Sequence, residues 1–314
     1  MQIVRGVEAL PAGSPFVATL GIFDGVHRGH QHVLDETVRV ARRVSADAVV
    51  ITFEPHPAAV LRGSAPPVLC TPAERLACFA QTGVGTTVVQ VFDQQFAAQS
   101  AEQFLHRLAD SRQLAALIMT AESAFGHDRE GTLAEARRLS PTLGFEVVEA
   151  SQLLLGGEPV SSTRIRRLLA AGRLAAAARL LGRRYAVTGE IVRGDGRGRQ
   201  LGYPTANFGF ESEVALPPDG IYAVRVAWGE GDAPTARRRA DGVASLGVRP
   251  TFGSGQRVLE AYLFGIDEDL YGERMRLEFV RHQRGEERFS SVGELISQMG
   301  RDAERARAIL GAPA

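Results

Sequence analysis

Lysine is absent from this sequence of 314 residues, so all 36 basic side chains are arginines. Without lysine the chain cannot form a P-loop of the GKS or GKT type, a Schiff base, or the strand lysine of a protein kinase. Any phosphate group that the protein binds must therefore be held by arginine, histidine, hydroxyl groups, backbone N–H groups or a metal ion. Genome composition is the simplest origin of the missing lysine, but the chemical restriction holds whatever its origin.

Cysteine, net charge and long apolar runs are also scarce. Cys70 and Cys78 fit neither a CxxC pair nor a disulfide framework, which favours two reduced thiols. The 36 acidic residues balance the basic ones, which argues against a broad nucleic-acid footprint or a polybasic membrane patch. No run approaches the roughly 18 apolar residues of a membrane span, and residues 1–13 lack an apolar signal core. We expect a cytoplasmic protein without nucleic-acid or membrane partners, and homo-oligomerisation stays open.

The first half of the chain alternates short apolar runs with amphipathic helical patterns. This alternation predicts a parallel sheet with helices on both faces. The expected strands are 17–23, 48–53, 86–92, 115–120 and 145–150. The expected helices are 30–44, 74–82, 101–109, 133–139, 161–170 and 173–181.

The pattern changes near residues 182–184, which predicts domains at 1–182 and 183–314. Short runs that alternate apolar and polar residues, broken by Gly and Pro, then favour an antiparallel barrel or sandwich. The expected strands are 186–192, 221–228, 242–246, 258–264 and 276–280, with a polar loop at 229–239. Ser291 and Glu294 predict a capping box for a closing helix. Its expected apolar stripe comprises Leu295, Ile296, Met299, Ala303, Ala306, Ile309 and Leu310.

Two histidines follow the first predicted strand, in the segment 21–31 (GIFDGVHRGHQ). Its glycines permit a tight turn, and the helix that follows offers free N–H groups to an anion. His27 and His30 can there donate hydrogen bonds to phosphate oxygens. A helix-capping turn with incidental histidines is the structural alternative, and the HxGH spacing makes it less attractive. Zinc is disfavoured because no third ligand is evident, and no GxGxxG fingerprint occurs.

The stretch FDGVHRGH resembles the signature of the nucleotidylyltransferase superfamily, in its FAD synthetase branch. Three further matches follow in order: ITFEPHP at 51–57, FGHDREG at 125–131 and VSSTRIR at 160–166. The resemblance implies that an FMN phosphate oxygen attacks the α-phosphorus of ATP and that pyrophosphate leaves. His27, His30 and Arg164 would stabilise the phosphates. The implied cofactor-binding residues of this half are Phe23, Asp24, Gly29, Ser161, Ser162 and Thr163.

One loop departs from that family pattern. Thr120, Glu122 and Ser123 stand where the branch usually has Gly, then Asp or Asn, then Phe. Glu122 keeps an acceptor on a longer side chain, whereas Ser123 removes an aromatic ring. This departure motivates a rival hypothesis, in which the protein is a divergent paralogue that is active only as a riboflavin kinase.

A second glycine-rich segment occupies 194–207 (GDGRGRQLGYPTAN). Alternating glycines can present N–H groups to a phosphate, and Thr205 and Asn207 offer hard oxygen ligands that suit Mg²⁺. GDGRG alone would be read as a flexible turn. With LGYPTAN it resembles the riboflavin kinase signature. The implied cofactor-binding residues of this half are Gly194, Gly196, Gly198, Arg199, Gly202 and Arg284.

Later segments resemble the same family: PDGIY at 218–222, SLGVRPTF at 245–252, LE at 259–260, LYG at 270–272, and Arg284 with Phe289. The resemblance implies that Glu260 is the general base that accepts the proton of the riboflavin 5′-hydroxyl. A solvated strand carboxylate is the alternative reading of Glu260. Ser245, Gly265 and Gly285 replace the family's usual Asn, Asp and Pro.

The combined expectation is an α/β nucleotidylyltransferase domain with a Rossmann-like parallel sheet, followed by an antiparallel β-barrel riboflavin kinase domain with a C-terminal helix. The resemblance implies phosphorylation of riboflavin to FMN and adenylylation of FMN to FAD. Mg²⁺ is the implied metal, ATP the co-substrate, and riboflavin, FMN and FAD the substrates and products. A non-catalytic flavin-binding or regulatory protein is the rival from another class.

Overall fold

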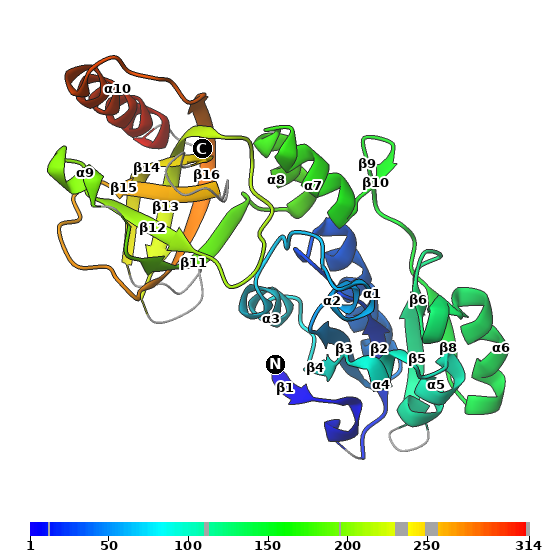
Figure 1. Cartoon of the computed structure of the whole chain (residues 1–314). Coiled ribbons are helices and arrows are strands. Elements are labelled where there is room, and N and C mark those ends of the chain that lie inside the picture. Colours follow the sequence, from blue (N-terminus) through cyan, green and yellow to red (C-terminus); the bar gives the residue numbers. More distant parts are fainter. Residues whose placement is uncertain (12, 110–112, 195, 230–237, 249–256, 312–314) are drawn as a thin grey trace. The chain divides into compact units, whose positions relative to one another are not determined.

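The computed structural model describes residues 1–11, 13–109, 113–194, 196–229, 238–248 and 257–311 (Figure 1). Contacts between residues divide the chain into two compact units. The first unit comprises residues 1–66 and 72–162, and the second comprises residues 67–71 and 163–314. Five residues from the first half of the chain, Pro67–Thr71, therefore belong to the second unit.

The first unit contains a six-stranded sheet in which every neighbouring pair of strands is parallel. Its order is β1-β4-β3-β2-β5-β8. The strands are β1 (Gln2–Arg5), β2 (Phe16–Leu20), β3 (Asp47–Glu54), β4 (Thr86–Val91), β5 (Leu114–Met119) and β8 (Glu146–Glu149). The five predicted strands are confirmed to within a few residues at their ends. The edge strand β1 was missed, since only Val4 of its four residues is buried.

Helices cover both faces of this sheet, as predicted. The longer helices are α1 (Arg28–Arg43), α3 (Pro72–Ala80), α5 (Ala101–Ala109) and α6 (Leu133–Leu143). Residues on alternate positions of the strands face two separate hydrophobic clusters, one packed by α1 and α3 and the other by α5 and α6. Shorter elements are α2 (Pro57–Arg62), α4 (Gln94–Ala97), β6 (Ala124–Phe125), β7 (Gly131–Thr132), β9 (Leu154–Leu155), β10 (Glu158–Pro159) and 3-10 turns at Val7–Ala9 and His127–Arg129.

The order of the strands places a topological switch point beside β2. From β2 the chain proceeds to β3 and β4 on one side, and β5 then lies on the other side of β2. In open parallel sheets, ligands bind outside the carboxyl ends of the strands where the order reverses. The segment 21–30 begins at the carboxyl end of β2, so the topology places both histidines at this point.

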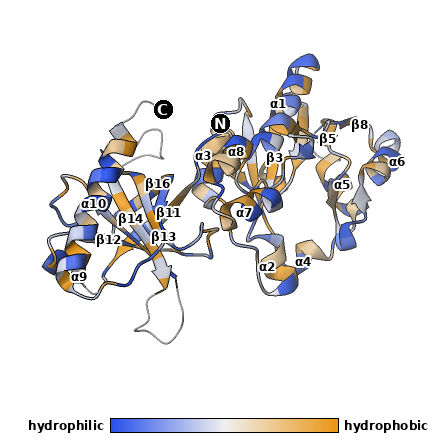
Figure 2. Cartoon of the chain, turned by 90° about the horizontal axis from the view of Figure 1, so that it is seen from above, coloured by the Kyte–Doolittle hydropathy of each residue, from blue (hydrophilic) through white to orange (hydrophobic). Residues whose placement is uncertain are grey.

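The second unit contains a closed antiparallel barrel in the order β11-β12-β15-β14-β13-β16. Its strands are β11 (Ala186–Val192), β12 (Thr205–Gly209), β13 (Gly220–Trp228), β14 (Arg238–Val248), β15 (Arg257–Leu263) and β16 (Arg274–Arg284). The unit also holds most of α7 (Ser162–Ala170) together with α8 (Leu174–Leu181), α9 (Arg197–Gln200) and α10 (Val292–Gly311). Strands of both units, such as β3 and β13, are largely hydrophobic in Figure 2. The predicted α/β and barrel classes are confirmed.

The prediction of a loop at 229–239 is wrong for its last two residues, because β14 begins at Arg238 and this residue pairs with Trp228. Residues 230–237 of that loop lie outside the described residues. The strand β12 was missed because its proline-led start resembles a bend. Within the described residues, we find no helix that combines the length and the apolar character needed to cross a membrane.

The final helix α10 begins near the predicted cap, with one difference. The Glu294 N–H donates to Ser291 Oγ at 3.2 Å, as a capping box requires. The Glu294 carboxylate, however, accepts from the backbone N–H and the hydroxyl of Ser290 rather than from Ser291. The predicted stripe is also shorter than expected, because Ile296 stays 37% exposed whereas the buried positions begin at Asp302.

An ion pair between Arg284 of β16 and Asp302 anchors α10 to the barrel. The Arg284 guanidinium donates to both oxygens of Asp302 at 2.6–3.2 Å, and the side chains are only 15% and 7% exposed. The same contact raises the pKa of Arg284 above its ordinary value. Because a buried charge without a partner is costly, this pair holds the helix in one position.

We predict that Asp302→Ala lowers the free energy of unfolding of the second unit by about 3 kcal/mol, the lower end for breaking a buried ion pair. The buried Arg284 guanidinium loses its main partner and keeps Glu287 at 3.9 Å and the Gly285 carbonyl oxygen. Trp228 is the only tryptophan of the chain and is 2% exposed in the barrel, so its fluorescence reports denaturant unfolding of this unit. Glu304→Ala, at an exposed position of α10, is the matched control. Equal stability of the two variants would contradict the anchoring role.

Candidate active sites

The turn after β2 adopts an uncommon backbone conformation. Phe23 and Val26 have φ angles of 53° and 36°, in the left-handed region that side chains other than glycine rarely adopt. Both side chains are buried in the core beneath the turn, and Asp24 is 6% exposed. Such strained residues persist where the surrounding structure fixes them, and they concentrate at functional sites.

His27 caps the N-terminus of α1 through its ring. Its Nδ1 accepts a hydrogen bond from the His30 N–H at 3.2 Å. An Nδ1 that accepts cannot carry the proton, so the neutral His27 ring carries it on Nε2, which is then a donor. The capping turn considered as the structural alternative is therefore present, and it sets the tautomer of His27.

His30 lies directly against His27, with ring centroids 3.5 Å apart and an interplanar angle of 17°. Its ring also meets the edge of Phe23 at 5.2 Å. His30 Nδ1 is buried and has no hydrogen-bond partner among the described residues. Burial, and secondarily the charge of His27, hold the pKa of His30 well below its ordinary value of 6.5. At neutral pH the site thus presents an uncharged imidazole whose ring nitrogen lacks a partner.

The segment before α7 closes against this turn. A Cβ on Gly29 would lie 3.0 Å from the Val160 carbonyl oxygen and 3.2 Å from the His27 ring, so a larger residue there would have to push one of them aside. The Ser162 hydroxyl donates to the Asp24 carbonyl at 2.9 Å. The structure thereby brings together Phe23, Asp24, His27, Gly29, His30, Ser161 and Ser162 within the first unit. Thr163 and Arg164 follow in the first turn of α7, in the second unit.

The departing loop forms a compact turn at the carboxyl end of β5. The Ser123 hydroxyl accepts from the Thr120 N–H at 3.0 Å and lies 3.0 Å from the Thr120 hydroxyl. Glu122 is exposed. The small serine thus replaces an aromatic ring with a hydrogen-bonded turn.

Three predicted residues of the barrel converge on one face. Side chains along a strand alternate between its two faces, and Ala206 and Ala261 point inward. Thr205, Asn207 and Glu260 therefore lie on the outer face. Asn207 and Glu260 are direct partners across β12 and β15, and the Thr205 hydroxyl donates to Glu260 Oε2 at 3.1 Å.

Glycines let the preceding loop approach these residues. A Cβ on Gly194 would lie 2.5–2.6 Å from the Asn207 amide, and one on Gly198 would lie 2.3 Å from the Tyr203 carbonyl oxygen. Gly196 and Gly202 have φ angles of 68° and 82°, which favour glycine. Asp195 of this loop lies outside the described residues, as do residues 249–252 of the later motif.

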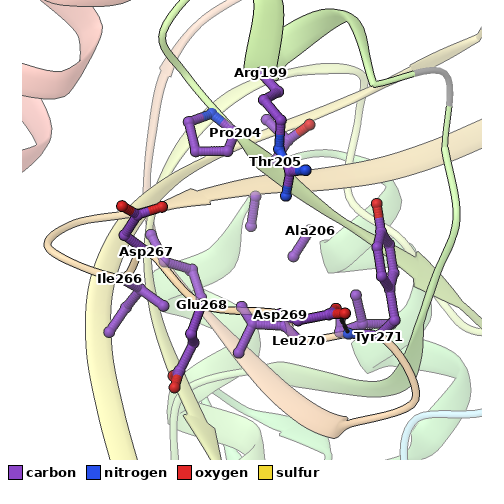
Figure 3. Close-up of a pocket in the computed structure, with 13 residues that line it drawn as sticks. Arg199, Pro204, Thr205, Ala206, Ile266, Asp267, Glu268, Asp269, Leu270 and Tyr271 are labelled. Atoms are coloured by element: carbon purple, nitrogen blue, oxygen red, sulfur yellow. Dashed lines mark hydrogen bonds between the residues drawn. The ribbon is translucent and has the colours of Figure 1, made fainter.

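A cavity of about 60 Å³ opens beside Thr205. Figure 3 shows Arg199 pointing into it alongside Thr205, with the segment Asp267–Tyr271 on the opposite rim. Ala206 and Ala261, neighbours in sequence of Thr205 and Glu260, also line it. The cavity thus lies on the side of the strands to which Ala206 and Ala261 point, and it combines one arginine with the carboxylates of Asp267, Glu268 and Asp269.

Arg284, unlike the other predicted ligand-binding residues, makes contacts that anchor the helix α10. Its guanidinium is committed to Asp302 and to the Gly285 carbonyl oxygen, at 2.6–3.2 Å. A ligand role for Arg284 stays a prediction, and its contacts support the positioning of α10. No group of three or more His, Cys, Asp or Glu side chains that could hold a metal ion occurs among the described residues.

Comparisons with known proteins identify the family of each half of the chain. The family model for FAD synthetase matches residues 11–164, and the model for riboflavin kinase matches residues 181–310. The bifunctional riboflavin kinase/FMN adenylyltransferase of Escherichia coli is 35% identical over 99% of this chain and 98% of its own length. The enzyme of the same description from Pseudomonas fluorescens is 36% identical over 98% of each chain.

A solved structure supports the same architecture over the whole chain. A crystal structure described as a macrolide-efflux protein from Streptococcus pneumoniae is 28% identical, has a TM-score of 0.84, and covers 98% of this chain and 99% of its own. Two family models in the predicted order, with full-length relatives above 30% identity, settle the relationship. The chain belongs to the family of bifunctional riboflavin kinase/FMN adenylyltransferases.

Proposed function

We propose that this protein phosphorylates riboflavin with ATP to give FMN, and adenylylates FMN with a second ATP to give FAD and pyrophosphate. The observation that carries the proposal is that each compact unit has its own cluster of candidate phosphate-binding or catalytic residues. The first has two stacked histidines at the switch point, and the second has Thr205, Asn207 and Glu260 on one barrel face. We assign residues 1–182 to the adenylyltransferase domain and 183–314 to the kinase domain, so that residues 163–182, which group with the second compact unit, belong to the adenylyltransferase domain in this assignment.

In the kinase unit, Glu260 acts as the general base. Its carboxylate accepts the proton of the riboflavin 5′-hydroxyl as that oxygen bonds to the γ-phosphorus, while the bond to the β,γ-bridging oxygen breaks and ADP leaves. The hydrogen bond from the Thr205 hydroxyl orients Oε2 of the carboxylate. Arg199, which precedes Thr205 in the glycine-rich segment, is our candidate for contact with the anionic nucleotide.

Mg²⁺ fits the donor set of this unit. Thr205, Asn207 and Glu260 offer oxygen atoms, which are the ligands that Mg²⁺ prefers, and they are too few for a cage made of protein alone. Substrate phosphates and water would complete its shell, as is usual for Mg²⁺ with nucleotides. Thr205 and Asn207 would hold the ion, whose charge neutralises the charge on the transferring phosphoryl group.

In the adenylyltransferase unit, a phosphate oxygen of FMN bonds to the α-phosphorus of ATP, and the bond to the α,β-bridging oxygen breaks. No covalent enzyme intermediate is needed, so positioning and electrostatics carry the catalysis. The Nε2–H of His27 and the ring of His30 are placed to donate hydrogen bonds to phosphate oxygens. Arg164 is our further candidate for phosphate stabilisation.

A second candidate function is a riboflavin kinase whose first unit has lost FAD formation. The compact Thr120–Ser123 turn favours it, because a serine there offers no ring for packing against a flavin or an adenine. Separate measurements of FMN and FAD formation distinguish the two candidates.

We predict that Glu260→Gln lowers kcat for FMN formation by about 10²–10⁴-fold, because the amide cannot accept the proton. The measurement is chromatographic separation of riboflavin and FMN after incubation with Mg²⁺-ATP. Glu190→Gln, at an exposed position of β11, which β12 separates from β15, is the matched control. An unchanged rate of FMN formation in Glu260→Gln would show that Glu260 is not the general base.

We predict that His27→Ala combined with His30→Ala lowers FAD formation from FMN by at least about 100-fold, since two phosphate donors are lost. FMN formation by the same chain should persist and shows that the protein has folded. His106→Ala, at an exposed position of α5, serves as the control histidine variant. FAD formation that survives the double substitution would disprove the role of this pair.

We predict that His30 titrates below pH 6.5 in the ligand-free protein, as measured by NMR with isotope-labelled histidine. ATP should raise this pKa, because nearby phosphate charge favours the imidazolium. As the pH falls, His30 of the unfolded chain is protonated before the buried His30 of the folded protein, because its pKa is higher. The free energy of unfolding of the first unit therefore falls as the pH drops below 6.5. A ligand-free His30 that titrates at 6.5 or above would contradict the buried neutral ring.

A further inference from the structure

A buried arginine beneath the first site is absent from every motif described above. Arg75 of α3 is 7% exposed. Its NH1 group donates to the Ile22 carbonyl oxygen at 3.2 Å, and its NH2 group donates to Glu54 Oε1 at 2.9 Å. NH2 also lies 3.5 Å from the Phe53 carbonyl oxygen. A charge is costly to bury, so its retention needs partners of this kind.

These contacts join the carboxyl ends of two neighbouring strands. Ile22 follows β2, and Phe53 and Glu54 end β3. The Ile22 carbonyl oxygen also accepts from the Thr52 hydroxyl at 3.2 Å. The guanidinium thereby fixes the peptide that immediately precedes Phe23, the first residue with a left-handed backbone in the turn.

The same helix supports the turn at a second point. Phe79 of α3 is fully buried and packs edge-on against the Phe23 ring, with centroids 5.5 Å apart. The Phe23 ring in turn contacts the imidazole of His30. A continuous set of contacts therefore runs from Arg75 and Phe79 through the turn to the catalytic candidate His30.

We propose that Arg75 is a positioning residue for adenylyl transfer, which acts by holding the Ile22 carbonyl and the Glu54 carboxylate in a fixed relation so that Phe23 places His30. This role rests on the proposed function of the first unit. The planar guanidinium bonds two groups in different directions from one rigid fork, which an ammonium on a flexible stem does less well. Arg75 itself contacts no reacting atom.

The test compares Arg75→Met and Arg75→Lys with the parent protein in both reactions. Misplacement of His30 weakens an interaction made mainly in the transition state, so kcat for FAD formation should fall on the order of 10- to 100-fold in Arg75→Met. KM for ATP and for FMN should change much less. Arg75→Lys should recover part of kcat, since one of the two contacts can be remade.

Two controls separate positioning from general damage. FMN formation by the same chain should stay unchanged, and Arg138→Met, which removes an exposed arginine of α6, should leave both reactions unchanged. A loss of both activities in Arg75→Met, with no recovery in Arg75→Lys, would assign Arg75 to stability alone. Unchanged FAD formation in Arg75→Met would overturn the proposal directly.

NMR titration of His30 supplies a readout that does not depend on activity. A ring displaced from its buried place should show a pKa that rises towards 6.5 in Arg75→Met, and Arg138→Met should leave it unchanged. If the parent protein makes no FAD, the proposed function fails, and this titration still decides the positioning role. An identical His30 pKa in the parent, Arg75→Met and Arg75→Lys would overturn it. If Arg75→Met does not fold, Arg75→Lys carries both measurements.

Discussion

Every phosphate contact in this protein has to be made without lysine, and both units are organised around that constraint. In the first unit, we propose that the stacked imidazoles of His27 and His30 and a helix N-terminus take the place of an ammonium group. In the second, we propose that a glycine-rich loop, Arg199 and an Mg²⁺ ion held by Thr205 and Asn207 do so. Neutral donors stabilise charge well only when they are held rigidly, because they gain little from long-range attraction.

Rigidity is reached in two different ways. At the switch point of the parallel sheet, a strained turn is fixed by buried side chains of α3 and by the cap that His27 gives to α1. On the barrel, strand register alone aligns Asn207 with Glu260, and closely approaching glycines bring the loop to them. The Arg284–Asp302 pair adds a fixed helix to the same barrel. Each site is thus a consequence of its fold class.

The sequence predicted the elements whose pattern is strong and local. The helix of α5 matched its predicted limits, and β11 did so as well, because alternation or helical spacing ran unbroken to both ends. The strand β12 and the shifted cap at Ser290 were missed, since proline and serine each permit several local structures. Arg75 could not have been found from sequence, because its importance lies in carbonyl groups that come from residues 22 and 53. The motifs indicated His27 and His30, but only the fold shows that their rings stack.

The most direct test of the account is a chromatographic assay of the purified protein with Mg²⁺-ATP, run once with riboflavin and once with FMN. The account predicts FMN from the first reaction and FAD with pyrophosphate from the second. FMN without FAD would contradict the assignment of the first unit and would leave a riboflavin kinase. Tight flavin binding with neither product would contradict the account as a whole.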